Sequence, residues 1–333
     1  MSAPSNSALA RLRLPAALAL PAWLKAVPWV AALATYFFAP QYAPLLTQIF
    51  IMILFAMSLD LLVGYTGIVS LGHAALFGTG AYLAGILCLR GLTDPLASAL
   101  VAMAVAAAVG FAFGSLMLRT KGLAFLMLSV SSAMLLYEIA NKATAITGGD
   151  DGLQGIAFSR VLGIWEFDFE GTIAFFYSLA ILFLAFAFMQ RLVNSPFGWS
   201  LRGIRENDLR MKAIGCQIYR RRLTAYTIAA ALAGLAGALQ AQCTGFVALN
   251  SLSFELSGAV LIMLIVGGSG RLYGPFFGVP IYMIAQDYLA KNDPTNWFLW
   301  QGVILLALVF FARGGLLGLA ERGFLRGFGK GTE

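Results

Sequence analysis

Long apolar windows without formal charge recur along the chain and are separated by shorter polar stretches. A helix that faces lipid is apolar nearly all round and satisfies its own backbone hydrogen bonds, so these windows predict spans better than periodicity does. Because a span takes about 20 residues, the pattern predicts an all-α fold, a polytopic transmembrane helical bundle of about ten spans within a range of about eight to eleven. The predicted spans are 22–39, 44–63, 68–89, 95–118, 122–140, 172–190, 223–243, 255–269, 273–290 and 297–312.

Composition excludes a soluble protein. Hydrophobic residues make up 60% of the 333 residues and charged residues 11%, against about 45–50% and about 25% in soluble domains. Three separated cysteines without a C-x-x-C pair predict no disulfide framework, metal site or redox cofactor. The apolar run after Arg11 and Arg13 lacks a clear cleavage site, which indicates an uncleaved first span.

Basic residues set the expected orientation. With the N-terminus in the cytoplasm, ten crossings return the C-terminus there, and most Lys and Arg then lie inside. The net charge of +7 is therefore explained without nucleic acid. The predicted organisation is a permease domain between two cytoplasmic tails, with one long loop on each side. Its ranges are 1–21 and 313–333 for the tails, 22–312 for the domain, 141–171 for the outer loop and 191–222 for the inner loop.

The two long loops carry their own signals. The inner one has Ser195-Pro196, a typical helix start, and Gly215, a typical helix stop. Apolar and basic residues alternate between them, which predicts one amphipathic helix or a broken pair, with an apolar face that needs cover. The outer loop has a turn-rich run, 147–152, and strict alternation over 164–170 that favours a short strand or an interfacial segment.

The stretch 61–89 is free of formal charge and contains six glycines, at positions 64, 67, 72, 78, 80 and 85. Two interpretations stay open. The glycines let helices approach closely, or the backbone unwinds between Gly64 and Gly72 beside a cavity, as in a broken or re-entrant segment. The second interpretation makes part of this stretch the translocation pathway. Its candidate residues are Asp60, Gly64, Gly67, Ser70, Gly72 and His73.

Two of these candidates have plainer alternatives. Asp60, near the inner end of the second span, is either a structural hydrogen-bonding group or part of the solute path. His73 is the only histidine, and a packing role, with its polar atoms hydrogen-bonded, competes with a proton relay.

The chain also contains a weak internal repeat, in which Gly67, Phe77, Gly78 and Tyr82 correspond to Gly267, Phe277, Gly278 and Tyr282. The match is either a coincidence or the trace of a duplication that produced two glycine-broken segments.

Enzymatic chemistry lacks support in the sequence. The nearest approach to a phosphate-binding loop, 327–331, lacks the final hydroxyl residue, and there is no HExxH motif. An ion-coupled secondary transporter remains an alternative, and it would place coupling carboxylates at mid-membrane. Asp60 and Glu138 do not form an obvious pair of that kind.

Five motifs in a fixed order give the chain a resemblance. They are LDLLVGYTGIVSLGHAALFGTGAYLAG (59–85), TGGDDGLQGI (147–156), SPFGWSLRGIREND (195–208) with AIG (213–215), AAALAGLAGAL (229–239) and VGGSGRLYGPFFG (266–278). With this set the chain resembles the membrane permeases of branched-chain amino acid ABC importers, most closely the LivM type. The resemblance covers residues 45–320 and implies a multi-pass protein of the bacterial inner membrane.

The resemblance implies partners and site residues. The chain would pair with a second, similar permease as a heterodimer, two cytoplasmic ABC ATPases would drive it, and a periplasmic binding protein would deliver the solute. Segment 195–215 would dock in the ATPase, and its candidate coupling residues are Arg205, Glu206, Asp208 and Gly215. Asp150 and Asp151 would contact the binding protein. Branched-chain amino acids are the expected solute, with urea or short amides as the alternative.

Overall fold

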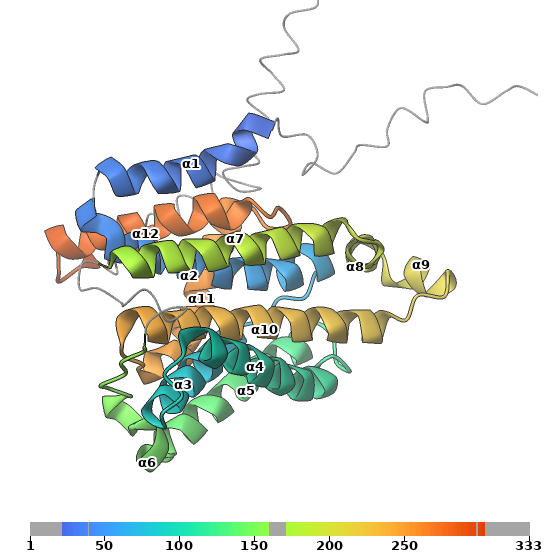
Figure 1. The fold of residues 1–333 in the computed structure, drawn as a ribbon. Coiled ribbons are helices and arrows are strands. Elements are labelled where there is room, and N and C mark those ends of the chain that lie inside the picture. The colour runs from blue at the N-terminus through green and yellow to red at the C-terminus, as the bar shows by residue number, and fades with distance from the viewer. Residues whose placement is uncertain (1–21, 39, 160–170, 298, 304–333) are drawn as a thin grey trace, which may run out of the picture. The chain divides into compact units, whose positions relative to one another are not determined.

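The computed structural model describes residues 22–38, 40–159, 171–297 and 299–303, and helices make up most of the described chain (Figure 1). Contacts divide it into two units, residues 1–40 and 41–333. The first contains α1 (Ala22–Phe38), an apolar helix with Pro28 inside it. The second contains α2 and every described element after it.

The second unit alternates long apolar helices with short ones. Among the described residues, five helical stretches are long and apolar enough to cross a membrane, namely Ala43–Thr66, Pro95–Met117, Leu123–Lys142, Thr172–Asn194 and Ile218–Thr244. The α-helices are α2 (Ala43–Asp60), α3 (His73–Leu89), α4 (Pro95–Met117), α5 (Leu123–Lys142), α6 (Thr144–Thr147), α7 (Thr172–Asn194), α8 (Pro196–Glu206), α9 (Asp208–Ala213), α10 (Ile218–Thr244), α11 (Phe254–Gly267) and α12 (Gly274–Asn292). Shorter turns are η3 (Pro40–Tyr42), the π-helical η4 (Leu61–Thr66), η5 (Gly149–Asp151) and η6 (Leu249–Leu252).

Helix α10 packs against α2, α3 and α4. Its glycines make these contacts close: a Cβ on Gly234 would clash with α4, and a Cβ on Gly237 would clash with the Phe77 carbonyl of α3. Small residues at such contacts let two helix backbones approach, which is how helices associate in a bilayer. A buried polar group adds to this packing, because Gln242 Nε2 donates to Pro95 O at 2.7 Å and Tyr177 Oη donates to Gln242 Oε1 at 2.9 Å.

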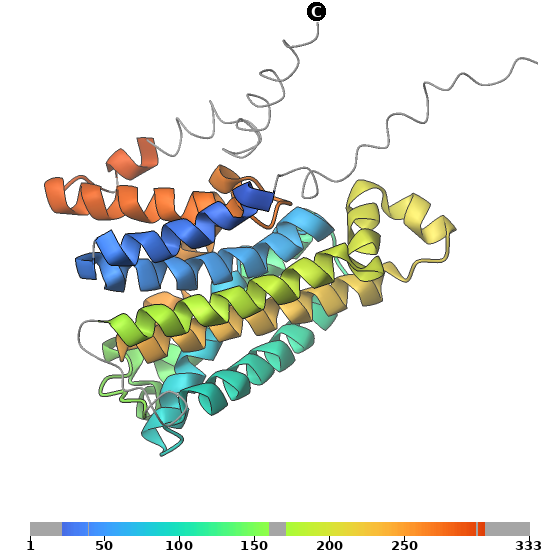
Figure 2. The ribbon, with the colours of Figure 1, turned by 45° about the horizontal axis from the view of Figure 1, so that its top comes forward.

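The bundle has two different ends. Helices α8 and α9 lie beyond the C-terminal end of α7 and the N-terminal end of α10, whereas α6 lies at the opposite end (Figures 1 and 2). At that opposite end Leu153 and Val247 form an antiparallel bridge, with N···O distances of 2.8 and 3.1 Å, which joins the segment after η5 to the segment after α10. The predicted inner loop and the described part of the predicted outer loop therefore lie at opposite ends.

The all-α prediction is confirmed, and the first nine predicted spans each coincide with a described helix. The third was wrong at its start: residues 68–72 are not helical and α3 begins at His73, because Gly67 leaves the preceding turn with a left-handed φ of +73°. At about 1.5 Å per residue, the 14 residues of α11 are short of the hydrocarbon core, about 30 Å thick. Most of span 297–312, and segment 164–170, lie outside the described residues.

Candidate functional site

Helix α2 ends in an interruption of the bundle. It continues as the π-helical η4, which stops at Gly67, and residues 67–72 form a non-helical segment, the first break. Ile68 N donates to Leu62 O at 3.0 Å, six residues back, so the carbonyl of Gly64 does not receive the amide that a continuing α-helix would supply. The sequence left open whether this stretch packs or unwinds, and the structure shows an unwound segment.

A second interruption lies opposite the first. Residues 268–273, the second break, join α11 to α12, and Gly268 and Gly270 have φ values of +106° and +81°. The two breaks meet at Asp60: its Oδ1 accepts a hydrogen bond from Gly270 N at 2.7 Å, and the residue is fully buried. A Cβ on Gly64 would clash with both Asp60 and Gly270. The hydrogen bond of Asp60 therefore links two segments that are far apart in the sequence.

His73 has the environment of a packing residue. Its Nε2 lies 2.8 Å from Ser58 Oγ, its ring is stacked on Phe55 with centroids 5.5 Å apart, and the side chain is fully buried. Ser70 is also fully buried. A Cβ on Gly72 would clash with Ser129 O of α5, so that glycine permits a close approach of the backbones.

Helix α8 packs directly on η4. Ser195 accepts from Gly198 N at 3.4 Å as the N-cap, Pro196 follows, and the predicted apolar face is buried through Leu201 and Ile204, with exposed fractions of 0% and 1%. At the end of the helix Arg205 Nη1 donates a hydrogen bond to Gly64 O. This side chain, predicted to face an ATPase, therefore binds a backbone carbonyl of its own chain.

Helix α9 makes the second half of the predicted broken pair. Asn207 caps it, and Asp208 pairs with Lys121 Nζ at 2.9 Å and with Arg222 Nη2 at 2.9 Å. Partial burial acts to raise the pKa of the Asp208 carboxyl, but the hydrogen bonds and positive charges of Lys121 and Arg222 outweigh it and hold the pKa below its usual value. Asp208 thus anchors α9 to the bundle.

The rest of α9 faces outward. Leu209 on α9 is 77% exposed, and Ile214, directly after the end of α9, is 76% exposed. Glu206, the last residue of α8, is also exposed. Gly215, with a φ of +83°, ends the segment as predicted and has open space where a Cβ would be.

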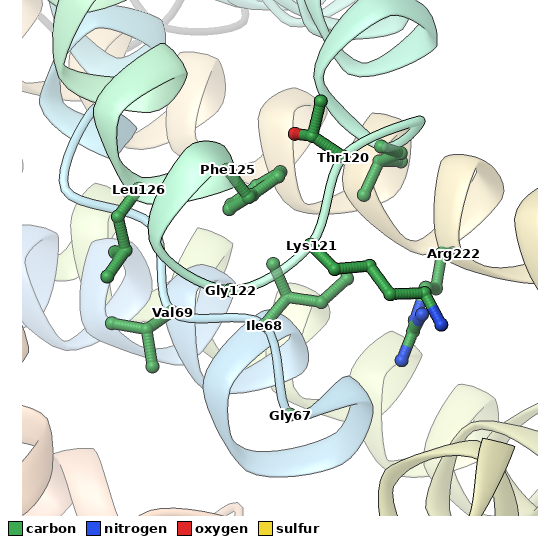
Figure 3. Close-up of a pocket in the computed structure, with 10 residues that line it drawn as sticks. Gly67, Ile68, Val69, Thr120, Lys121, Gly122, Phe125, Leu126 and Arg222 are labelled. Atoms are coloured by element: carbon green, nitrogen blue, oxygen red, sulfur yellow. The ribbon is translucent and has the colours of Figure 1, made fainter.

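A pocket of about 220 Å³ borders the first break. Ile68 and Val69 line it from the break, Phe125 from α5, and Lys121 approaches Arg222 at one side (Figure 3). Of the six predicted pathway residues Gly67 lines this pocket. The other five, Asp60, Gly64, Ser70, Gly72 and His73, are buried in the chain.

The opposite end presents the predicted acidic turn. Asp150 and Asp151 are exposed on η5, and Gly148 and Gly152 on either side have φ values of +76° and +69°. Within the described residues there is no cluster of three or more His, Cys, Asp or Glu that could hold a metal ion.

Sequence reasoning missed two parts of this arrangement. Gly270 was not singled out, although the echo of Gly67 in Gly267 pointed to a second interrupted segment close to it. Lys121 and Arg222 have the sequence context of ordinary basic residues outside the spans, and no signal in the sequence ties them to Asp208.

Comparisons with known proteins agree on one family. Residues 41–312 match the family described as branched-chain amino acid transport system / permease component. The chain is 26% identical over 299 residues to the high-affinity branched-chain amino acid transport system permease protein LivM of Salmonella typhimurium, covering 80% of this chain and 68% of the relative. It is 27% identical over 300 residues to LivM of Escherichia coli, covering 81% and 68%.

A probable branched-chain amino acid transport permease protein LivM of Methanocaldococcus jannaschii is 28% identical over 238 residues, covering 66% of this chain and 68% of the relative. No solved structure matches the chain.

Proposed function

The chain belongs to the family of branched-chain amino acid transport system permease components, and from that premise we propose that it is the membrane permease subunit of an ATP-driven importer of branched-chain or closely related amino acids. It passes solute through the membrane and does not itself hydrolyse ATP. Two ATPases bind on the cytoplasmic side, a second similar permease pairs with it in the bilayer, and a periplasmic binding protein delivers the solute.

Two exposed apolar side chains, Leu209 on α9 and Ile214 directly after it, are the observation that carries this proposal. α8 buries Leu201 and Ile204 against the bundle, whereas Leu209 and Ile214 remain 77% and 76% exposed beyond the membrane-spanning helices. Arg210 and Lys212 lie between them in the sequence. Apolar side chains with basic neighbours fit a partner groove that has an apolar floor and an acidic rim, which supports ATPase docking at this surface.

A double variant tests the docking. Leu209→Ser with Ile214→Ser should leave the permease folded and inserted, because neither side chain is packed, but should reduce co-purification of the ATPases at least tenfold. Ile146→Ser is the control, since Ile146 is 50% exposed at the opposite end. Unchanged co-purification in the double variant would reject the docking surface. Uptake that persists without any ATPase would favour the ion-coupled transporter instead.

The proposed orientation places α8 and α9 in the cytoplasm, as the excess of basic residues there requires. Cys216 lies just after Gly215 at that end and is partly exposed, whereas Cys88 is buried. In oriented vesicles a membrane-impermeant maleimide should label Cys216 from the cytoplasmic face alone. Labelling of Cys216 from the periplasmic face would reverse the orientation.

The opposite end receives the binding protein in this proposal. Asp150 and Asp151 are exposed there on a turn held by the Leu153–Val247 bridge. Replacing both aspartates by Lys should reduce uptake dependent on the binding protein several-fold without changing assembly of the complex. Calorimetry on the binding protein with leucine, urea and a short amide decides the solute class, because selection of the solute rests largely with that protein.

A further inference from the structure

Arg205 occupies two environments at once. Arg205 lies at the end of α8 and is exposed as a whole residue. Its Nη1 nevertheless donates a hydrogen bond to the carbonyl oxygen of Gly64 inside the bundle. Of the two arginines on α8, the other, Arg202, lies over the rings of Tyr65 and Trp199 at 5.2 and 5.1 Å. The end of α8 is therefore held to η4 by a polar contact in addition to apolar packing.

The carbonyl that Arg205 binds is one that the fold leaves open. Gly67 and Ile68 both direct their amides to Leu62 O, so the helical hydrogen-bond pattern ends before it reaches Gly64. Unpaired carbonyls at a helix C-terminus carry partial negative charge, and a cation there is stabilising. Arg205 thus caps the interrupted end of α2 from a different helix.

The same guanidinium also adjoins the second break. A Cβ added to Gly270 would lie 2.9 Å from Arg205 Nη1 and 3.0 Å from Gly64 O, which places Gly270 next to both groups. Asp60 completes the group, because its carboxylate accepts from Gly270 N at 2.7 Å and interacts electrostatically with Arg205. One side chain of α8 therefore touches both interrupted segments.

The first break has space beside it. The Cγ of Arg205 would lie 3.1 Å from a Cβ on Gly67, so the arginine stem packs on the start of the break. Ile68 and Val69, the next residues, line the pocket of about 220 Å³. A displacement of Arg205 can therefore be followed by movement of residues 67–69 without displacing a packed core.

We propose that Arg205 is a positioning residue that carries movement of α8 to both breaks, and that it is not a contact to the ATPase. The inference rests on the proposed function, in which the ATPases move α8 and α9. Movement of α8 then pulls on Gly64 O and Gly270 together, so that the ends of α2, α11 and α12 change position as one group.

The test compares Arg205→Met, Arg205→Lys and the control Arg119→Met, an exposed arginine at the same end of the bundle. The complex of both permeases and both ATPases is reconstituted with the binding protein. Arg205→Met should reduce leucine uptake at least tenfold while the ATPases co-purify as in the wild type. Arg205→Lys should restore part of the uptake, because the ammonium can still donate to Gly64 O, and Arg119→Met should behave as the wild type.

Labelling at the break gives a readout that a merely structural role would not change. Val69→Cys, at a position 38% exposed, is placed in a variant whose native cysteines are replaced by Ser. Its rate of reaction with a maleimide should differ between the nucleotide-free complex and the complex trapped with ATP and vanadate. Arg205→Met should abolish that difference.

Wild-type uptake by Arg205→Met, an unchanged labelling difference, or loss of ATPase co-purification in Arg205→Met would each overturn the inference. The last outcome would make Arg205 a docking residue. Absence of any ATP-dependent uptake in the unmodified complex would overturn the proposed function itself, and so the two failures are distinguishable.

Discussion

Glycines serve two different purposes in two regions of this bundle. Where α3 meets α10, Gly80 and Gly237 lie within continuous helices and bring two backbones into contact. At the breaks, Gly67 and Gly270 have positive φ values, and the chain around them is held by Asp60 and Arg205. The first arrangement is filled and apolar, whereas the second is interrupted, polar and beside a pocket. Glycine content alone therefore does not separate a packing contact from an interrupted segment.

The largest effect is expected at the packing contact. A Cβ on Gly237 would clash with the backbone carbonyl of Phe77, which cannot move like a flexible side chain. Gly237→Ala should destabilise the protein by about 2 kcal/mol or more, since overpacking typically costs about 1–3 kcal/mol. The measurement is thermal unfolding of the purified protein in detergent. Gly258→Ala, in α11, is the matched control, because a Cβ at Gly258 would have no neighbouring atom within 4 Å. Equal stability of the two variants would contradict the packing role of Gly237.

The break should respond differently. Gly67→Ala and Gly91→Ala both place a side chain at a positive φ, +73° and +98°, and each should cost about 1–2 kcal/mol in the left-handed conformation. A Cβ at Gly67 would also lie 3.1 Å from Arg205 Cγ, whereas nothing lies within 4 Å at Gly91. Leucine uptake per folded complex should therefore fall several-fold in Gly67→Ala alone. An equal fall in Gly91→Ala would remove the distinction between the break and an ordinary turn.

Local sequence rules predicted the helices of this fold but not the contacts between its distant segments. Charge-free windows located the described spans because a lipid-facing helix needs apolar residues, and Ser195-Pro196 and Gly215 marked the bounds of the α8–α9 segment because capping is local chemistry. The contact of Asp60 with Gly270 joins residues 210 positions apart, which local rules do not reach. Likewise Arg205 has the sequence context of a surface charge, and its role depends on the open carbonyl of Gly64 that appears only in three dimensions.

The smallest effect is expected at Asp208, which anchors α9 near the break. Its folded-state pKa lies below the usual value, so its ion pairs stabilise the folded state above the unfolded-state pKa of about 3.9 and are lost as the pH falls through the folded-state pKa. Asp208→Asn should reduce stability by about 1 kcal/mol at pH 7, since exposed Lys121 contributes little. The difference from wild type should vanish at low pH in thermal unfolding, and a difference that persists there would show a role other than charge pairing. Asp150→Asn, exposed at the other end, is the control.

Transport of amino acids by this chain should depend on ATP hydrolysis by the ATPases bound at the end of the bundle that carries α8 and α9. The direct test is uptake of labelled leucine into proteoliposomes that contain the two permeases and their ATPases, with the binding protein on the face of η5. Uptake should require ATP on the α8–α9 side and stop when ATP is withheld. Uptake by the permease alone, driven by an ion gradient and indifferent to ATP, would contradict the account.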